Sequence, residues 1–209
     1  MKAIYSERLL WPTKLASLEL LGTDVDVHNA QLQALVIDNA DTDPNPDIEA
    51  RVHDLHLIED ASVAWLVENI ANACQQYIGA TYGMQIALRG VAIKQGQCIN
   101  SHTESHESDL MVTYWPGGDR AKCGESINQN SARDIAPTFL AEDPSRRLTD
   151  LRLPFESRHS FHIAPRPGLM LVGPAHLPHN LWPYLGTVPF IHIVAQVRVA
   201  WPPQYDRRF

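Results

Sequence analysis

The sequence predicts an α+β protein that is mainly β, with its helices in the N-terminal part. Two observations favour this class. Apolar residues recur at helical spacing within residues 25–40 and 59–77. From Met84 onward the apolar residues alternate as they do in a strand, and short apolar runs are broken by Gly and Pro. We therefore expect helices that brace a β-rich second part.

The chain length favours one domain. Its 209 residues are enough to enclose a sizeable core, and β-rich folds of this size commonly stay single. We expect a single domain over residues 1–209. Within it, residues 1–83 are expected to form a helical support region and residues 84–200 the β core.

The first helix is expected over residues 25–40, with Asp24 or Asp26 as its N-cap. The second, over residues 59–77, has the more regular apolar face, and Gly79 stands where a helix would end. Between the helices, residues 41–47 concentrate turn-forming residues and two prolines, which predicts a loop. The apolar positions that suggest a buried face in the first helix are Val27, Leu32, Leu35, Val36 and Ile37.

Five strands are expected in the β part. They cover residues 85–94, 110–115, 160–163, 169–172 and 188–199. Periodicity fades over residues 116–154, and a stretch of that length inside a compact domain is typical of a lid or binding loop.

The charge balance excludes several classes of partner. The formal net charge is -7, and no basic cluster exceeds a pair of arginines, which disfavours nucleic acid and anionic membranes as partners.

No apolar run is long enough to span a bilayer, and the first residues lack the apolar core of a signal peptide. Three cysteines without a CxxC pair suit reduced thiols. We expect a cytoplasmic protein.

His102 and Glu104 form a candidate metal site. Side chains two residues apart leave the same face of an extended backbone, so these two can hold one ion. The third ligand has to come from farther along the chain, and His179 is the best candidate. Two imidazoles and one carboxylate that leave the other positions open are the arrangement of non-haem Fe(II) oxygenases.

Spacing leaves alternatives to this ligand set. His106 alternates with Glu104 as His102 does, and Asp109 is a further rival. His176 competes with His179 for the distal position. Residues 101–109 are also polar enough to form nothing more than a solvated loop.

The chain resembles a bacterial and phage family of 2-oxoglutarate- and Fe(II)-dependent oxygenases built on the double-stranded β-helix. The likeness covers residues 84–199. Its first stretch is His102-Thr103-Glu104, followed by a strand that ends in Trp115-Pro116. The second runs from Phe139 through an Asp-Pro pair to Arg146, and the third is a Pro-x-x-Gly-apolar run within residues 165–183 that ends at a histidine.

The resemblance implies a jelly-roll, cupin-like barrel with Fe(II) held by His102, Glu104 and His179, since His179 and not His176 falls on the family's distal ligand position. It also implies 2-oxoglutarate as cosubstrate and hydroxylation as the default reaction. The substrate would be a small molecule or a protein side chain. It would enter across residues 116–154, where Trp115, Phe139 and Arg146 are available to contact it.

The chain departs from the superfamily pattern at one position. An Arg or Lys is usual on the last strand, where it pairs with the far carboxylate of 2-oxoglutarate, but Phe190 stands there. We expect His192 or Arg198 to substitute, with Lys94 as another possible cation, and Tyr114 to donate a hydroxyl to the cosubstrate.

Two other functions fit the same residues. A cupin-like metalloenzyme that uses no 2-oxo acid would suit the missing cation, and a non-catalytic β-sandwich binding module would need no metal. A homodimer contact is a further expectation, through aromatic side chains beside Pro-rich turns. Those side chains are Trp182, Tyr184 and Trp201.

Overall fold

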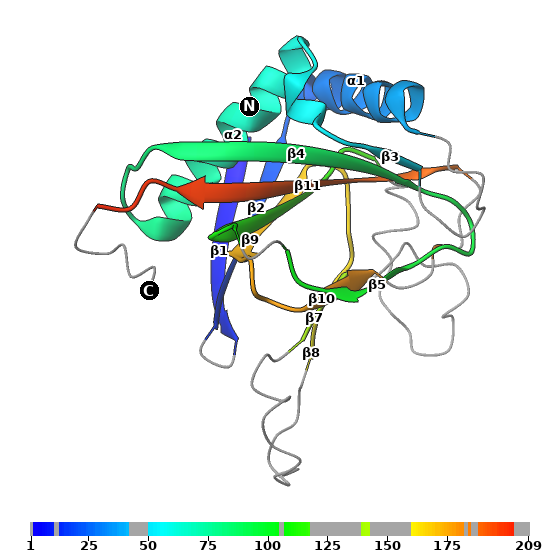
Figure 1. The fold of residues 1–209 in the computed structure, drawn as a ribbon. Coiled ribbons are helices and arrows are strands. Elements are labelled where there is room, and N and C mark those ends of the chain that lie inside the picture. The colour runs from blue at the N-terminus through cyan, green and yellow to red at the C-terminus, as the bar shows by residue number, and fades with distance from the viewer. Residues whose placement is uncertain are drawn as a thin grey trace, which may run out of the picture.

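The computed structural model describes residues 2–10, 13–41, 50–104, 107–117, 139–142, 160–181, 184 and 188–202. Two antiparallel sheets dominate it, one of seven strands and one of four. Two helices, α1 (Thr23–Asn39) and α2 (Ala61–Ile78), lie on the side of the large sheet that faces away from the small sheet (Figure 1). The predicted class, mainly β with N-terminal helices, is confirmed.

The strands run through the whole chain. The described strands are β1 (Lys2–Leu10), β2 (Thr13–Leu21), β3 (Ala50–Val52), β4 (Met84–Ile93), β5 (Ile99–His102), β6 (Leu110–Trp115), β7 (Phe139–Glu142), β8 (Ser160–Ile163), β9 (Leu169–Pro174), β10 (His179–Leu181) and β11 (Phe190–Val199). A single 3-10 turn, η1 (Leu55–Leu57), precedes α2. All five strands predicted for the β part are present.

The sheet order mixes distant parts of the chain. The large sheet runs β1-β2-β9-β6-β11-β4-β3 and the small one β5-β10-β7-β8. From β4 on, the chain passes back and forth between the two sheets, so strands that pair are mostly far apart in sequence. The longest ladder of this part joins β11 to β4, from Phe190 opposite Ile93 to Val199 opposite Met84.

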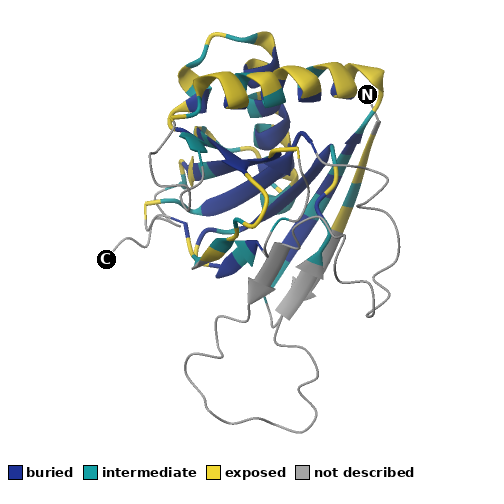
Figure 2. Cartoon of the chain, turned by 90° about the vertical axis from the view of Figure 1, so that its right-hand side faces the viewer, coloured by how far each residue is buried: buried dark blue, intermediate teal, exposed yellow. Residues whose placement is uncertain are grey.

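The large sheet has a core on each face. On the helix side, Leu32 of α1 and Leu66 of α2 are fully buried against alternate residues of β11 such as Ile193. Between the sheets, Trp115 and Phe190 belong to a second buried cluster. Figure 2 shows the sheet strands buried and the outer surface of the helices exposed. Alternation along each strand therefore decides which side chains face the helices and which face the small sheet.

Local sequence explains the helix ends. The Asp60 side chain caps α2 by accepting a 2.7 Å hydrogen bond from the Ser62 amide, and Gly79 ends the helix in the left-handed region at φ 79°. Helix α1 begins after Gly22 without a side-chain cap, so the N-cap predicted at Asp24 or Asp26 is wrong. Helix α1 packs closely on β4, since a Cβ at Gly90 would lie 2.6 Å from a methyl carbon of Val36.

The N-terminal region differs from the prediction in its strands. Residues 1–83 were expected to be helical support, but they also contain the β1–β2 hairpin and β3. The alternation of Leu18 and Leu20 with Ser17 and Glu19 is a strand pattern that the prediction overlooked. In α1, Val27 and Ile37 are exposed at 68% and 50%, so the predicted buried face was too wide.

Several expectations fall on residues outside the described ranges. These include most of the loop expected at 41–47 and most of the lid or binding region at 116–154, with Arg146. Phe139 lies in β7, where only the backbone is described. Within the described part of the chain, no helix has the length and apolar character needed to cross a membrane.

Candidate metal centre

Three side chains converge where β5 meets β10. His102 ends β5 and His179 begins β10, and the two residues face each other directly in the antiparallel ladder. Glu104 follows β5, and its amide donates a 3.0 Å hydrogen bond to the carbonyl of Ala175, which holds this segment against the turn before β10. The small sheet therefore joins residues from two distant stretches of the chain.

The geometry suits a single ion. The donor atoms of His102, Glu104 and His179 all lie within 4.8 Å of one another. Oε1 of Glu104 is 3.5 Å from Nε2 of His102 and 3.7 Å from Nε2 of His179. The two imidazole rings lie 4.4 Å apart between centroids. The two nitrogen atoms and the oxygen atom thus converge on one point and leave its other side open, as a three-ligand metal site requires.

Both imidazoles are oriented by backbone carbonyls. Nδ1 of His102 lies 2.8 Å from the carbonyl oxygen of Asn100, and Nδ1 of His179 lies 3.0 Å from that of Leu177. In both cases the carbonyl is two residues earlier in the chain. A proton on Nδ1 that is donated to this carbonyl leaves the lone pair on Nε2, which faces Glu104. This is the tautomer that a metal ligand needs.

Glu104 is the charged member of the cluster. Its side chain is buried; Oε2 accepts a 2.8 Å hydrogen bond from Nε2 of Gln196, while Oε1 has no hydrogen-bond donor among the described residues. A guanidinium nitrogen of Arg89 is 3.6 Å from Oε1. Oε1 therefore has a cation nearby but no hydrogen-bond donor among the described residues, and a metal ion placed between it and the two Nε2 atoms would satisfy it.

The protonation states also suit a metal. Burial raises the pKa of Glu104, but the nearby His102 imidazole, the hydrogen bond from Gln196 and the charge of Arg89 outweigh it and bring this pKa to about 2. Burial lowers the pKa of His179 to about 4. At neutral pH the site therefore presents a carboxylate and a neutral distal imidazole, the forms that bind metal. The neighbouring Glu104 carboxylate raises the pKa of His102 above its usual value.

A cavity of about 330 Å³ opens beside His102. It is lined by Arg51, Arg89, Val91, Ile99, Asn100, His102, His192 and Val194. His192 is buried and stacks on Trp115, with ring centroids 5.6 Å apart and planes at 11°. Burial lowers the pKa of His192 to about 3, so this imidazole is neutral at physiological pH.

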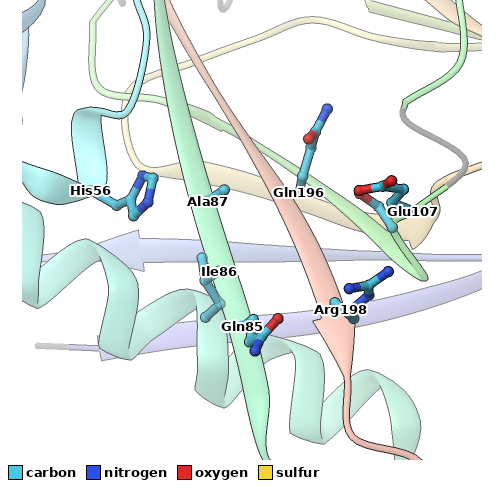
Figure 3. Close-up of a pocket in the computed structure, with 8 residues that line it drawn as sticks. His56, Gln85, Ile86, Ala87, Glu107, Gln196 and Arg198 are labelled. Atoms are coloured by element: carbon cyan, nitrogen blue, oxygen red, sulfur yellow. The ribbon is translucent and has the colours of Figure 1, made fainter.

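Two predicted cofactor-binding residues lie elsewhere. Tyr114 belongs to the helix-side core, where its hydroxyl donates a hydrogen bond to Oδ1 of Asn29 on α1. It alternates with Trp115 along β6 and so faces away from the small sheet. Arg198 is exposed and lines a separate cavity of about 250 Å³, near Glu107 and Gln85 (Figure 3). Neither residue lines the cavity beside His102, so both expectations are corrected.

Two of the three alternative ligands, Asp109 and His176, lie in the described part of the chain, and neither belongs to the cluster. Asp109 uses Oδ2 to accept a 2.7 Å hydrogen bond from the Val199 amide, and His176 is exposed. His106 lies outside the described residues. Glu104 is only 5% exposed, so the alternative that residues 101–109 form nothing more than a solvated loop is wrong.

The other expected cation, Lys94, is exposed just beyond β4, and Phe190 is buried between the sheets. The prediction missed Arg51 and Arg89. Arg89 alternates with Val91 within a predicted strand, so its position on the His192 side of the sheet could have been inferred once the pairing of β4 with β11 was known.

Comparisons with known proteins bear on the fold. No protein-family model matches the chain, and no curated protein sequence is similar to it. Among solved structures, AviO1 from Streptomyces viridochromogenes Tue57 is 14% identical with a TM-score of 0.59, over 95% of this chain and 91% of that chain. A Pseudomonas putida prolyl-4-hydroxylase is 10% identical with a TM-score of 0.60, over 90% and 94% of the two chains.

A third similar structure is SnoN, described as a non-heme alpha ketoglutarate dependent epimerase from nogalamycin biosynthesis. It is 11% identical with a TM-score of 0.62, over 88% of this chain and 75% of that chain. A Burkholderia pseudomallei oxidoreductase described as a member of the 2OG-Fe(II) oxygenase family is also similar, at 12% identity and a TM-score of 0.53. The chain thus has the fold of these enzymes, and the resemblance predicted from sequence is confirmed at the level of the fold.

Proposed function

We propose that the protein is a non-haem Fe(II)- and 2-oxoglutarate-dependent oxygenase of the hydroxylase type. The observation that carries this proposal is the convergence of two imidazole Nε2 atoms and Oε1 of Glu104 within 4.8 Å. His102, Glu104 and His179 would be the iron ligands. The similar structures whose descriptions name 2-oxoglutarate or alpha ketoglutarate enzymes support the same function.

The strand order supports a double-stranded β-helix. Four strands of the large sheet, β4, β11, β6 and β9, face the four strands of the small sheet, and the chain crosses repeatedly between the two sets. A jelly roll has this arrangement of two antiparallel sheets. The proposed ligands lie on the small sheet and on the segment after β5. Residues of the large sheet form part of the wall of the cavity beside them.

The chain's own residues would fix the positions of the metal ligands and exclude water. Bound Fe(II) together with a 2-oxo acid supplies the oxidation chemistry that no protein side chain offers. Asn100 and Leu177 orient the imidazoles, Gln196 holds the second oxygen of Glu104, and His192, stacked on Trp115, lines the cavity. The substrate would be a small molecule or a protein side chain that reaches the open side of the metal.

Two measurements test this function. Anaerobic reconstitution with Fe(II) should give one tightly bound iron per chain. Aerobic incubation with 2-oxoglutarate should then give succinate, if slowly without a substrate. One iron without any succinate would favour a cupin-like metalloenzyme that uses no 2-oxo acid, an alternative supported by Phe190 at the position usual for a cation. No bound metal at all would leave a non-catalytic binding module.

Other features stay predictions. These are a single domain over residues 1–209, a cytoplasmic location, the absence of nucleic acid and membrane partners, and a homodimer. Tyr184 and Trp201 are only partly buried, as a dimer contact would need, and Trp182 lies outside the described residues.

A further inference from the structure

Arg89 brings a positive charge to the same oxygen atom that faces the two imidazoles. Its Nη2 is 3.6 Å from Oε1 of Glu104, and the Nε2 atoms of His102 and His179 lie 3.5 and 3.7 Å from that oxygen. A metal ion held between Oε1 and the imidazoles would therefore have the guanidinium group as a close neighbour. The two cations would share one carboxylate oxygen.

The fold holds Arg89 beside this oxygen. Arg89 lies within β4, which pairs with β11 on one side and with β3 on the other, so its backbone belongs to the interior of the large sheet. The Arg89 side chain is 31% exposed, and its Nε is buried without a hydrogen-bond partner among the described residues. The carboxylate of Glu104 is the anion that the structure places next to it.

The two oxygen atoms of Glu104 have partners of different charge. Gln196 donates to Oε2 from a neutral amide, whereas Arg89 approaches Oε1 with a full positive charge. A neutral donor orients the carboxylate without opposing a cation. A guanidinium group and a divalent ion beside the same oxygen repel each other, and the repulsion is stronger in a partly buried site than in water.

The same charge is useful when no ion is bound. A carboxylate that is only 5% exposed is costly to bury without a cation or a donor. Arg89 supplies a cation at 3.6 Å, and removal of one partner from a buried ion pair leaves the other charge uncompensated. Arg89 therefore stabilises the charged form of Glu104 before a metal binds.

We propose that Arg89 competes with the metal ion for Oε1 of Glu104 and thereby lowers the affinity of the site for divalent metal. The ion then stays exchangeable, so the occupancy of the site follows the supply of Fe(II). Removal of the charge should tighten metal binding, whereas removal of a residue that only supports Glu104 would weaken it. This inference rests on the proposed function, because it takes His102, Glu104 and His179 as the ligands.

Calorimetric titration of chelator-treated protein with Mn(II), without any 2-oxo acid, tests the role of Arg89. Arg89→Met should bind Mn(II) about tenfold or more tightly than the wild type, and EDTA should remove the ion more slowly. Arg89→Lys keeps the charge and should stay within about threefold of the wild type. Arg198→Met is the matched control, since it removes an exposed arginine that lines the other cavity, and it should leave the affinity unchanged.

Thermal unfolding gives a second readout. Without metal, Arg89→Met should melt at a lower temperature than the wild type, because Glu104 loses its cation. Saturating Mn(II) should raise the melting temperature more in the variant than in the wild type, since a ligand that binds the folded state stabilises it according to its affinity. Tighter Mn(II) binding together with lower metal-free stability is the result expected from a competing cation.

The outcomes separate this inference from the function on which it rests. Mn(II) affinity in Arg89→Met that equals or falls below the wild-type value overturns the role of Arg89 but keeps the metal site. An equal gain in Arg198→Met also overturns it, because the effect would then come from the overall charge. If Arg89→Met does not fold without metal, Arg89→Gln replaces it with the same expected gain. Wild-type protein that binds no Mn(II) contradicts the proposed function itself.

Discussion

Gln196 donates a 2.8 Å hydrogen bond from Nε2 to Oε2 of Glu104, and this leaves Oε1 to face both imidazoles. The bond connects β11 of the large sheet to the segment after β5. It gives the two carboxylate oxygens different partners, one a protein amide and the other the proposed ion. A carboxylate fixed in this way binds a metal through one oxygen.

We predict that Gln196→Leu weakens metal binding. Loss of a hydrogen bond that orients a metal ligand typically lowers metal affinity by roughly 10- to 100-fold. Competition with a chelator of known affinity measures the change. Gln85→Leu is the control, because Gln85 is exposed on β4 and lines the other cavity (Figure 3). Equal affinities for wild type and Gln196→Leu would show that Glu104 needs no support from β11.

The buried His192 should make the metal-free protein sensitive to mild acid. The unfolded imidazole has a pKa near 6.5, whereas the folded one has a pKa of about 3. Between these values the unfolded state binds more protons, so the free energy of unfolding falls as the pH falls through this window. At pH 5 the loss from this group should be about 2 kcal/mol at most.

The variant His192→Phe tests this pH dependence, since it keeps a ring beside Trp115 but cannot bind a proton. Urea denaturation at pH 7 and pH 5 should show a smaller drop in the variant than in the wild type. His179 contributes in the same direction, because its pKa is about 4, so part of the drop should persist. An unchanged drop in His192→Phe would mean that His192 is not a buried neutral group.

Tyr114→Phe should separate stability from ligand binding. The Tyr114 hydroxyl joins β6 to Asn29 of α1 on the helix side of the sheet. Its removal leaves Asn29 without that donor and should cost about 1 to 2 kcal/mol of stability. Affinity for the metal and for 2-oxoglutarate should stay at the wild-type value. A selective loss of 2-oxoglutarate affinity would restore the role first expected for this residue.

Periodicity predicted the parts of the fold that depend on short stretches of sequence. Helix α2 has both a regular apolar face and an end signal, Gly79, and its bounds were close to those predicted. The two-residue spacing of His102 and Glu104 likewise carried information, because their side chains meet at the end of β5, with Nε2 and Oε1 3.5 Å apart. Each of these features is set by neighbours along the chain.

Features that depend on pairing could not be inferred in the same way. Whether Tyr114 or Trp115 faces the small sheet is decided by the register of β6 with β11 and by the helices on the opposite face. Arg51 lies in a three-residue strand whose place is fixed only by pairing with β4. The choice of His179 over His176 likewise depends on its pairing with His102, which spacing alone does not reveal.

Metal affinity in a set of histidine variants tests the central claim most directly. We predict that wild-type protein binds one Fe(II) per chain, that His102→Ala and His179→Ala abolish tight binding, and that the exposed His176→Ala retains it. His106→Ala, outside the described residues, should also retain it. Tight binding in His179→Ala together with its loss in His176→Ala or His106→Ala would contradict the site formed by His102, Glu104 and His179.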